Sequence, residues 1–201
     1  LYHLSGLPMI CPVVRSVRAS GCVDAVYVAC DDPRLEAVVI ADGGMAVRVD
    51  QACDSGTQRI AHALELIDSN GESGAIDFVL NVQGDEPFVS AEALNALVDA
   101  LRNGADIATL ATPIEPAQRA AQNVVKVVRD QNGCALYFSR AAIPGDRHVG
   151  LYGFTADALR AVAHLPRGPL STAEDHEQWG WLEAGGPIAV APSGPMGPSI
   201  D

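Results

Sequence analysis

The sequence is short of basic residues: 13 lysines and arginines stand against 25 aspartates and glutamates, so the formal net charge at pH 7 is −12. Nucleic acids and anionic membrane surfaces are bound through a basic surface that replaces their counterions. The composition therefore argues against both kinds of partner. It does not argue against an anionic small molecule, because a bound divalent cation can reverse the local field.

The chain also lacks an apolar run long enough to span a bilayer, and no positively charged start leads into an apolar stretch, as in a secretory signal. Its five cysteines are odd in number and widely spaced, without the Cys-x-x-Cys or Cys/His spacing of a metal site. We expect them to be reduced and mostly buried. These absences together predict a soluble protein of the cytoplasm.

The 201 residues are 48% apolar, which excludes disorder and supplies a core large enough to fold without disulfides or a structural metal. Short β-branched runs alternate with stretches of helical periodicity. This alternation predicts a three-layer α/β fold whose sheet is parallel in its first half and mixed in its second. Strands are expected at 24–30, 45–49, 77–82, 106–114, 124–129, 134–139, 148–154 and 187–191, and helices at 34–42, 55–69, 91–102, 156–164 and 173–184.

No interdomain linker is visible, so residues 1–201 are expected to form a single domain in which the β-rich part, about 106–192, is a subdomain. The first residues read as a polar turn at 5–8, with no strand ahead of the first helix. An open α/β sheet binds its ligand beyond the carboxyl ends of the strands, often at the loop after the first strand. That loop is expected to lie outside these 201 residues.

The segment Asn81–Pro87 is the most informative stretch. A buried strand leads into a glycine turn that carries two adjacent acids, Asp85 and Glu86. A carboxylate in this position is where an α/β enzyme holds Mg²⁺ against substrate phosphates. An ordinary acidic turn before a helix would look the same, because negative charge also suits a helix N-terminus.

A second turn, at Ser55 and Gly56, opens a helix with free amides and is an anion- or base-binding turn in principle. Ser55 followed by Gln58 is also a capping box, which explains the serine without any ligand.

The second half of the chain carries three polar candidates on strand patterns. Arg140 stands at a strand end, where its guanidinium could fork onto a carboxylate or phosphate. His148 and Tyr152 are four residues apart on a strand and therefore face the same side. A surface arginine and a satisfied core histidine and tyrosine would give the same pattern.

Two further candidates follow in the expected helix at 173–184. Ser171 and Glu174 match the S-x-x-E capping box, which would explain Glu174 with no function. Gln178 would lie one turn beyond Glu174 on the same face, so that the two could share a polar ligand. Trp179 and Trp181 are expected to serve in packing.

Taken in order, these stretches resemble the 3-deoxy-manno-octulosonate cytidylyltransferase family, and the resemblance spans essentially the whole chain. The matching strings are P-M-I, D-S-G-T-Q-R, N-V-Q-G-D-E-P, V-K-V-V, A-L-Y-F-S-R-A-A-I-P, H-V-G-L-Y-G-F and E-Q, followed by a terminal Asp. The third and fifth strings are specific to this family among nucleotidyltransferases. The related CMP-sialate synthetases share the fold but not these strings.

The resemblance implies a three-layer, Rossmann-like mixed sheet of the nucleotide-diphospho-sugar transferase type, with helices on both faces. It implies an enzyme that joins CTP to 3-deoxy-manno-octulosonate (Kdo) and gives CMP-Kdo and pyrophosphate for lipopolysaccharide biosynthesis. Mg²⁺ is the implied cofactor, and a homodimer through the β-rich half is the implied assembly. The metal would draw the anomeric hydroxyl toward deprotonation, while the protein positions the reactants and neutralises charge.

The family's site residues carry over by position. Ser55 and Gly56 match the turn that approaches the cytosine, and Gln83 matches a residue that contacts the sugar. Mg²⁺ would be held by Asp85 and Asp201, which with Arg140 are the expected catalytic residues. The pocket for the Kdo acid would be lined by Arg140, His148, Tyr152, Glu174 and Gln178. Arg140 would bind the carboxylate, and His148 would orient a hydroxyl rather than act as a base.

Three departures from the family pattern leave alternatives open. The family's first strand and its phosphate loop, I-P-A-R-x-x-S-x-R-L-P-G-K, have no counterpart here. A longer segment also separates the positions of Asp146 and His148 in the family, and Gly180 replaces an Arg. We hypothesise that the 201 residues are ordered segments of a longer protein. The alternatives are a non-catalytic nucleotide-binding relative, or an enzyme for another acidic sugar of the sialic or amino-substituted type.

Overall fold

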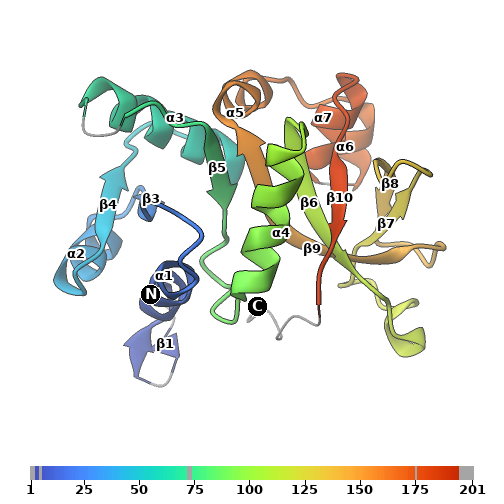
Figure 1. Ribbon diagram of the computed structural model, residues 1–201, viewed down its shortest axis with the longest axis horizontal. Helices are drawn as coiled ribbons and strands as arrows, with labels where there is room; N and C mark the ends of the chain where they lie inside the picture. The colour runs from blue at the N-terminus through green and yellow to red at the C-terminus, as the bar shows by residue number, and fades with distance from the viewer. Residues whose placement is uncertain (1–2, 5, 72–73, 175, 195–201) are drawn as a thin grey trace. The chain divides into compact units, whose positions relative to one another are not determined.

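The computed structural model describes residues 3–4, 6–71, 74–174 and 176–194. Within them the chain divides into two compact units (Figure 1). The first contains Leu1–Ile76 and Gln83–Leu94, and the second contains Asp77–Val82 and Asn95–Pro195. Asp201, one of the two expected metal ligands, lies outside the described residues.

The first unit is built around two parallel strands, β3 (Tyr27–Cys30) and β4 (Met45–Arg48), joined by α2 (Pro33–Ala41). This β-α-β arrangement agrees with the strands and helix expected there. Asp32 caps α2 by accepting a hydrogen bond from the Arg34 amide at 2.8 Å, and Pro33 fills the first helical position. The core of the unit contains Val14 of α1 (Ile10–Ala19) together with Val28, Cys30 and Val39. The unit also contains α3 (Gly56–Ser69).

The start of the first unit differs from the expectation. A short hairpin of β1 (His3–Leu4) and β2 (Leu7–Pro8) precedes α1, where we expected a turn and no strand. Gly6 has a φ of +84°, a conformation that glycine adopts readily and that closes the tight connection. Strands of two residues are too short to show a period of two, so the sequence pattern could not reveal them.

The second unit is built on a mixed sheet. Among the described residues six strands take part, in the order β10 (Ala189–Pro192), β6 (Ile107–Thr112), β9 (Asp146–Thr155), β7 (Lys126–Arg129) and β8 (Ala135–Ser139), with β5 (Phe78–Asn81) also pairing with β9. The β10–β6 pair is parallel and the others are antiparallel. The mixed sheet expected for the second half is therefore confirmed. A 3₁₀ turn at Pro116–Gln118 lies between β6 and β7.

Two longer helices accompany this sheet, α4 (Ala91–Arg102) and α5 (Ala156–Ala163), and both agree with the expected ranges. Ser90 caps α4 by accepting a hydrogen bond from the Ala93 amide. Gly153 of β9 allows α4 to approach closely, because a Cβ there would come within 3.0 Å of Leu101 and 3.4 Å of Leu97. Apolar side chains such as Leu97 and Leu101 form most of the interior of the second unit.

The helix expected at 173–184 is wrong in its bounds. The structure has two short helices instead, α6 (Pro169–Glu174) and α7 (Gln178–Glu183). Pro169 suits the first turn of α6, and the Glu183 carboxylate caps that turn by accepting hydrogen bonds from the Leu170 and Ser171 amides, at 3.0 and 3.4 Å. This cap comes from a residue distant in sequence, so local periodicity could not reveal the break.

The five cysteines are all free. Cys11 and Cys30 are buried and the other three are half-buried, so the expected burial holds for two of the five.

Candidate active site

The turn at Ser55 lies at the start of α3 in the first unit. The Ser55 hydroxyl accepts a hydrogen bond from the Gln58 amide at 3.1 Å, and the Gln58 side chain accepts one from the Asp54 amide at 2.7 Å. The capping box is thus present, but the Gln58 side chain bonds to the amide of Asp54, the residue before the cap, rather than to the amide of Ser55. Gly56 follows as the first helical residue. Capping and ligand binding are compatible here, because the serine hydroxyl still has its own hydrogen to donate.

The acidic loop follows β5 and belongs to the first unit from Gln83 onward. It begins with a turn in which the Glu86 amide donates to the Gln83 carbonyl at 3.2 Å. The Pro87 carbonyl accepts a hydrogen bond from the Ser16 hydroxyl of α1 at 3.1 Å, which anchors the far end of the loop. Gln83 is exposed and Asp85 is half-buried, so both side chains are accessible to a ligand.

The remaining candidates lie in the second unit, at neighbouring strand ends. β7 runs between β8 and β9, and Lys126 at its start pairs with Ser139 on one side and Arg147 on the other. Arg140 and His148, each one residue further along the chain, therefore lie on either side of Val125, the residue that precedes β7. The Arg140 guanidinium donates to Nε2 of His176 at 2.7 Å, so this ring nitrogen of His176 is unprotonated.

Glu174 joins this cluster from the end of α6. Its carboxylate accepts a hydrogen bond from the Ser139 hydroxyl, at 3.2 Å to one oxygen and 3.3 Å to the other, and lies 3.4 Å from the Tyr137 hydroxyl. Ser171 lies inside α6 and bonds back to the Gly168 carbonyl. The capping-box interpretation of Glu174 is therefore wrong: the carboxylate faces the end of β8, just before Arg140, and not a helix N-terminus.

His148 is enclosed by polar and aromatic neighbours. Its Nε2 lies 2.9 Å from the Thr109 hydroxyl, and its ring packs against Phe138 and Tyr152 at centroid distances of 5.0 and 5.6 Å. Burial, assisted by the nearby His176, lowers the pKa of His148 to about 3. The imidazole is consequently neutral at physiological pH.

Tyr152 lies between His148 and α7 and contacts both. Its ring packs edge-on against Trp181 at 5.1 Å, and burial, with a smaller contribution from Glu177, raises its pKa. Trp179 packs edge-on against Tyr137 at 4.5 Å. Both tryptophans are buried, which confirms the expectation that they serve in packing.

Gln178 is the first residue of α7 and is 4% exposed. It does not lie one helical turn beyond Glu174, because the two residues belong to different helices. That expected relation is wrong, although both residues remain in the second unit.

The contacts thus link His148 directly with Tyr152, and they place Glu174 against Ser139, the residue before Arg140. Ser55, Gly56, Gln83 and Asp85 belong to the first unit. Sequence reasoning missed the residues that bond to this cluster from within the second unit, namely Thr109, Ser139 and His176. Their positions follow from strand register and loop closure, for which single-sequence periodicity gives no signal.

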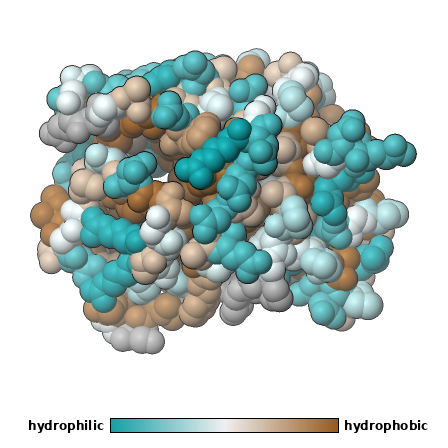
Figure 2. All heavy atoms as spheres, in the orientation of Figure 1, coloured by the Kyte–Doolittle hydropathy of each residue, from teal (hydrophilic) through white to brown (hydrophobic). Residues whose placement is uncertain are grey.

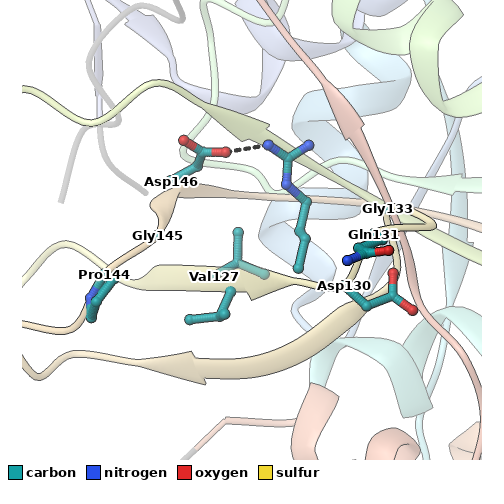
Figure 3. A pocket seen from close by; sticks show the side chains of 9 residues that line it. Val127, Asp130, Gln131, Gly133, Pro144, Gly145 and Asp146 are labelled. Carbon is teal, nitrogen blue, oxygen red and sulfur yellow. Dashed lines mark hydrogen bonds and ion pairs between the residues drawn. The ribbon is translucent and has the colours of Figure 1, made fainter.

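A separate cavity of about 440 Å³ opens on the second unit at the β7–β8 turn (Figure 3). Arg129 forms an ion pair with Asp146 on its wall, beside Pro144 and Gly145. None of the expected site residues lines it, so this cavity is not part of the cluster described above.

Comparisons with known proteins agree with one another. The cytidylyltransferase family model matches residues 1–185. A 3-deoxy-manno-octulosonate cytidylyltransferase from an Anaeromyxobacter species is 43% identical over 100% of this chain and 84% of its own length. The protein of the same description from Syntrophobacter fumaroxidans is 42% identical, over 95% of this chain and 80% of its own.

Among solved structures, a CMP:2-keto-3-deoxy-manno-octonic acid synthetase complexed with CTP matches with a TM-score of 0.89. It is 33% identical, over 100% of this chain and 85% of that one. A 4-diphosphocytidyl-2C-methyl-D-erythritol synthase from Anaerococcus prevotii matches with a TM-score of 0.63 at 12% identity, which shows likeness of fold alone.

Proposed function

The chain belongs to the cytidylyltransferase family, and we propose that it transfers the CMP group of CTP to the anomeric hydroxyl of Kdo, releasing pyrophosphate. The product is the activated sugar used in lipopolysaccharide biosynthesis. The observation that supports this most strongly within the structure is the cluster of Arg140, His148, Tyr152 and Glu174. It offers one cation, two neutral polar rings and one carboxylate to an acidic, polyhydroxylated sugar.

In this proposal Arg140 binds the carboxylate of the sugar. A guanidinium is planar and always protonated, and its parallel N–H groups match the two oxygens of a carboxylate. Its contact with His176 uses one terminal nitrogen, Nη1, at 2.7 Å. The guanidinium has five N–H donors, so it keeps a pair of donors for the ligand carboxylate. The Glu174 carboxylate would accept hydrogen bonds from sugar hydroxyls, with Ser139 holding it in place.

His148 would orient a hydroxyl rather than remove its proton. A group with a pKa of about 3 is a weak base for an alcohol at neutral pH. The Thr109 hydroxyl donates its single hydrogen to a main-chain carbonyl, and it therefore accepts from Nε2–H of His148. Nδ1 of the ring is then an acceptor, suited to a sugar hydroxyl. The aromatic ring of Tyr152 would support the imidazole.

We propose Mg²⁺ as the cofactor, held by Asp85 together with Asp201. Among the described residues no group of three or more His, Cys, Asp or Glu side chains could enclose a metal. One or two carboxylates completed by substrate phosphates are the usual arrangement for Mg²⁺, so the half-buried Asp85 fits such a site. The ion, when bound, neutralises phosphate charge and lowers the pKa of the sugar hydroxyl. Asp85 itself is positioned by the loop that Ser16 anchors at Pro87.

We further propose that Ser55 and Gly56 approach the cytosine and that Gln83 contacts the sugar. The amides at the start of α3 and the exposed Gln83 amide support these assignments.

A homodimer of a cytoplasmic enzyme is proposed as well. The edge strand β8 exposes Leu136 by 58%, which supports association through the second unit. Within the described residues no helix has the length and apolar character needed to cross a membrane.

The test is pyrophosphate release from CTP and Mg²⁺, measured with Kdo, with a sialic-type acid and with no sugar. Release that depends on Kdo is the expected result. Release only with the other acid would keep the enzyme and change its substrate. Binding of CTP with no release of pyrophosphate in the presence of either acid would identify a nucleotide-binding relative. Arg140→Ala should raise the KM for Kdo far more than the KM for CTP, because the proposed contact is to the acid alone.

A further inference from the structure

Lys126 is the only lysine of the chain; the other 12 basic residues are arginines. It is also fully buried, with an exposed fraction of 0%. Its ammonium donates to three main-chain carbonyls, at 3.1 Å to Ala121, 2.8 Å to Val124 and 2.6 Å to Arg140. An ammonium has three N–H donors, so the three carbonyls use it completely.

A buried charge is costly, and it persists in a folded protein only where its hydrogen bonds are satisfied. Burial lowers the pKa of Lys126, and the neighbouring Arg140 adds to the effect. An arginine could not substitute, because a flat guanidinium does not match three carbonyls arranged around one nitrogen. In a chain that uses arginine everywhere else, a lysine at this position indicates that this bonding geometry is required.

The position of Lys126 connects it with the proposed acid site. Its main chain pairs with Ser139 and Arg147, the residues immediately before Arg140 and His148. The preceding carbonyl, of Val125, accepts a hydrogen bond from the His148 amide at 2.9 Å. The segment from Ala121 to Lys126 therefore bonds to the main chain of both Arg140 and His148.

We propose that Lys126 is a positioning residue for the acid-binding site: its ammonium fixes the main chain at Arg140 and so holds the guanidinium in the orientation that binds the substrate carboxylate. The proposal rests on the proposed function, since it concerns binding of the acidic sugar by Arg140. The proposal adds Lys126 to the acid-binding site as a residue that touches no substrate and acts only through Arg140.

The test is the kinetics of Lys126→Met, which keeps the length of the side chain and removes its donors. We expect the KM for Kdo to rise about tenfold, the effect of losing one hydrogen bond that involves a charged group. The KM for CTP and kcat should stay within about twofold of the wild type, because the change acts on the acid site. A loss of general stability would instead lower the concentration of active enzyme, and with it the apparent kcat, without changing the ratio of the two KM values.

Two controls separate positioning from packing. Val190→Ala removes a buried side chain from β10, and it should lower the melting temperature without changing the ratio of the two KM values. In an Arg140→Ala background, Lys126→Met should add nothing further to the KM for Kdo, because the effect passes through Arg140. An equal rise in that background, or an unchanged KM for Kdo in Lys126→Met alone, would overturn the proposal.

A second measurement needs no change at Lys126. Labelling lysine with ¹⁵N gives one side-chain signal in this chain, and Kdo binding should shift it in the wild type but not in Arg140→Ala. No shift at saturating Kdo would refute the role of Lys126. Turnover of Kdo by the wild type is measured first. Its absence would refute the proposed function and the positioning role together, whereas turnover with no effect at Lys126 would refute only the latter.

Discussion

Thr109→Val is expected to weaken the second unit and to release His148. Thr109 is fully buried on β6, and its hydroxyl lies 2.8 Å from the Leu151 carbonyl, 3.2 Å from the Val149 carbonyl and 2.9 Å from Nε2 of His148. The register between β6 and β9 shifts at this point, because Thr109 pairs with Tyr152 while Leu110 pairs with Val149. Leu151 lies within this irregularity, and the Thr109 hydroxyl donates a hydrogen bond to its carbonyl.

The size of the effect follows from this bonding. Valine has nearly the shape of threonine, so packing is retained while a carbonyl and an imidazole N–H lose their partner. Each buried unsatisfied group costs about 1–3 kcal/mol, so the two together give a loss of roughly 2–6 kcal/mol in the free energy of unfolding. For a chain of this length, at about 2–4 °C per kcal/mol, that corresponds to a decrease in melting temperature of about 4–24 °C.

Urea unfolding of the wild type, Thr109→Val and Thr109→Ser measures the difference. Serine keeps the hydroxyl, so Thr109→Ser should recover most of the loss. The ¹⁵N chemical shifts of the imidazole should show Nε2–H in the wild type and a mixture of tautomers in Thr109→Val. A loss below about 0.5 kcal/mol, within the range of an ordinary surface change, would refute the reasoning. So would a wild-type His148 that carries its proton on Nδ1.

Three further predictions concern charge and the proposed site. Because the folded pKa of His148 is about 3 against an ordinary 6.5, only the unfolded chain takes up a proton between these values. The stability that neutral His148 contributes is complete above pH 6.5 and is lost as the pH falls toward 3; urea unfolding across this window should show a shallower pH slope in His148→Asn. Glu174→Gln should lower kcat/KM for Kdo about tenfold, the contribution of one or two hydrogen bonds to a charged group, with little change in melting temperature. Asp85→Asn should lower pyrophosphate release by about a hundredfold or more and weaken the dependence on Mg²⁺ concentration, with unchanged circular dichroism.

Much of the fold could be predicted from the sequence because its signals are local. The periodic stretches at 34–42, 55–69 and 91–102 are helices in the structure, within a residue or so at each end. Ser55 and Ser90 cap two of them as expected. The features that were missed have no local signal: the β1–β2 hairpin is too short for a period, and the break between α6 and α7 depends on Glu183, thirteen residues from Leu170.

The site was only partly predictable, for a related reason. The family resemblance indicated Arg140, His148, Tyr152 and Glu174, whereas local rules alone explained Glu174 as a helix cap. The structure corrects that explanation, since the carboxylate bonds to Ser139, which is 35 residues away. Contacts of this kind depend on which strand ends meet. A single sequence does not specify this, because the same alternation of residues fits several strand orders.

Three of the buried polar residues in the second unit share one arrangement. Thr109 bonds to His148, Lys126 to the Arg140 main chain, and Ser139 to Glu174. Each is at most 2% exposed.

Burying a polar group stabilises nothing by itself, and a core of apolar residues would pack as well at less cost in desolvation. The three buried groups each hold one residue of the proposed acid site, and we infer that they fix that site before the substrate arrives. Binding energy is then available for recognising the sugar rather than for ordering the side chains. An apolar replacement of any one of the three removes a hydrogen bond from the residue that it holds. Stability and affinity for the acid should therefore fall together at Thr109 and Ser139. A variant that removes both members of a bonded pair should recover stability alone, because it gives up the site.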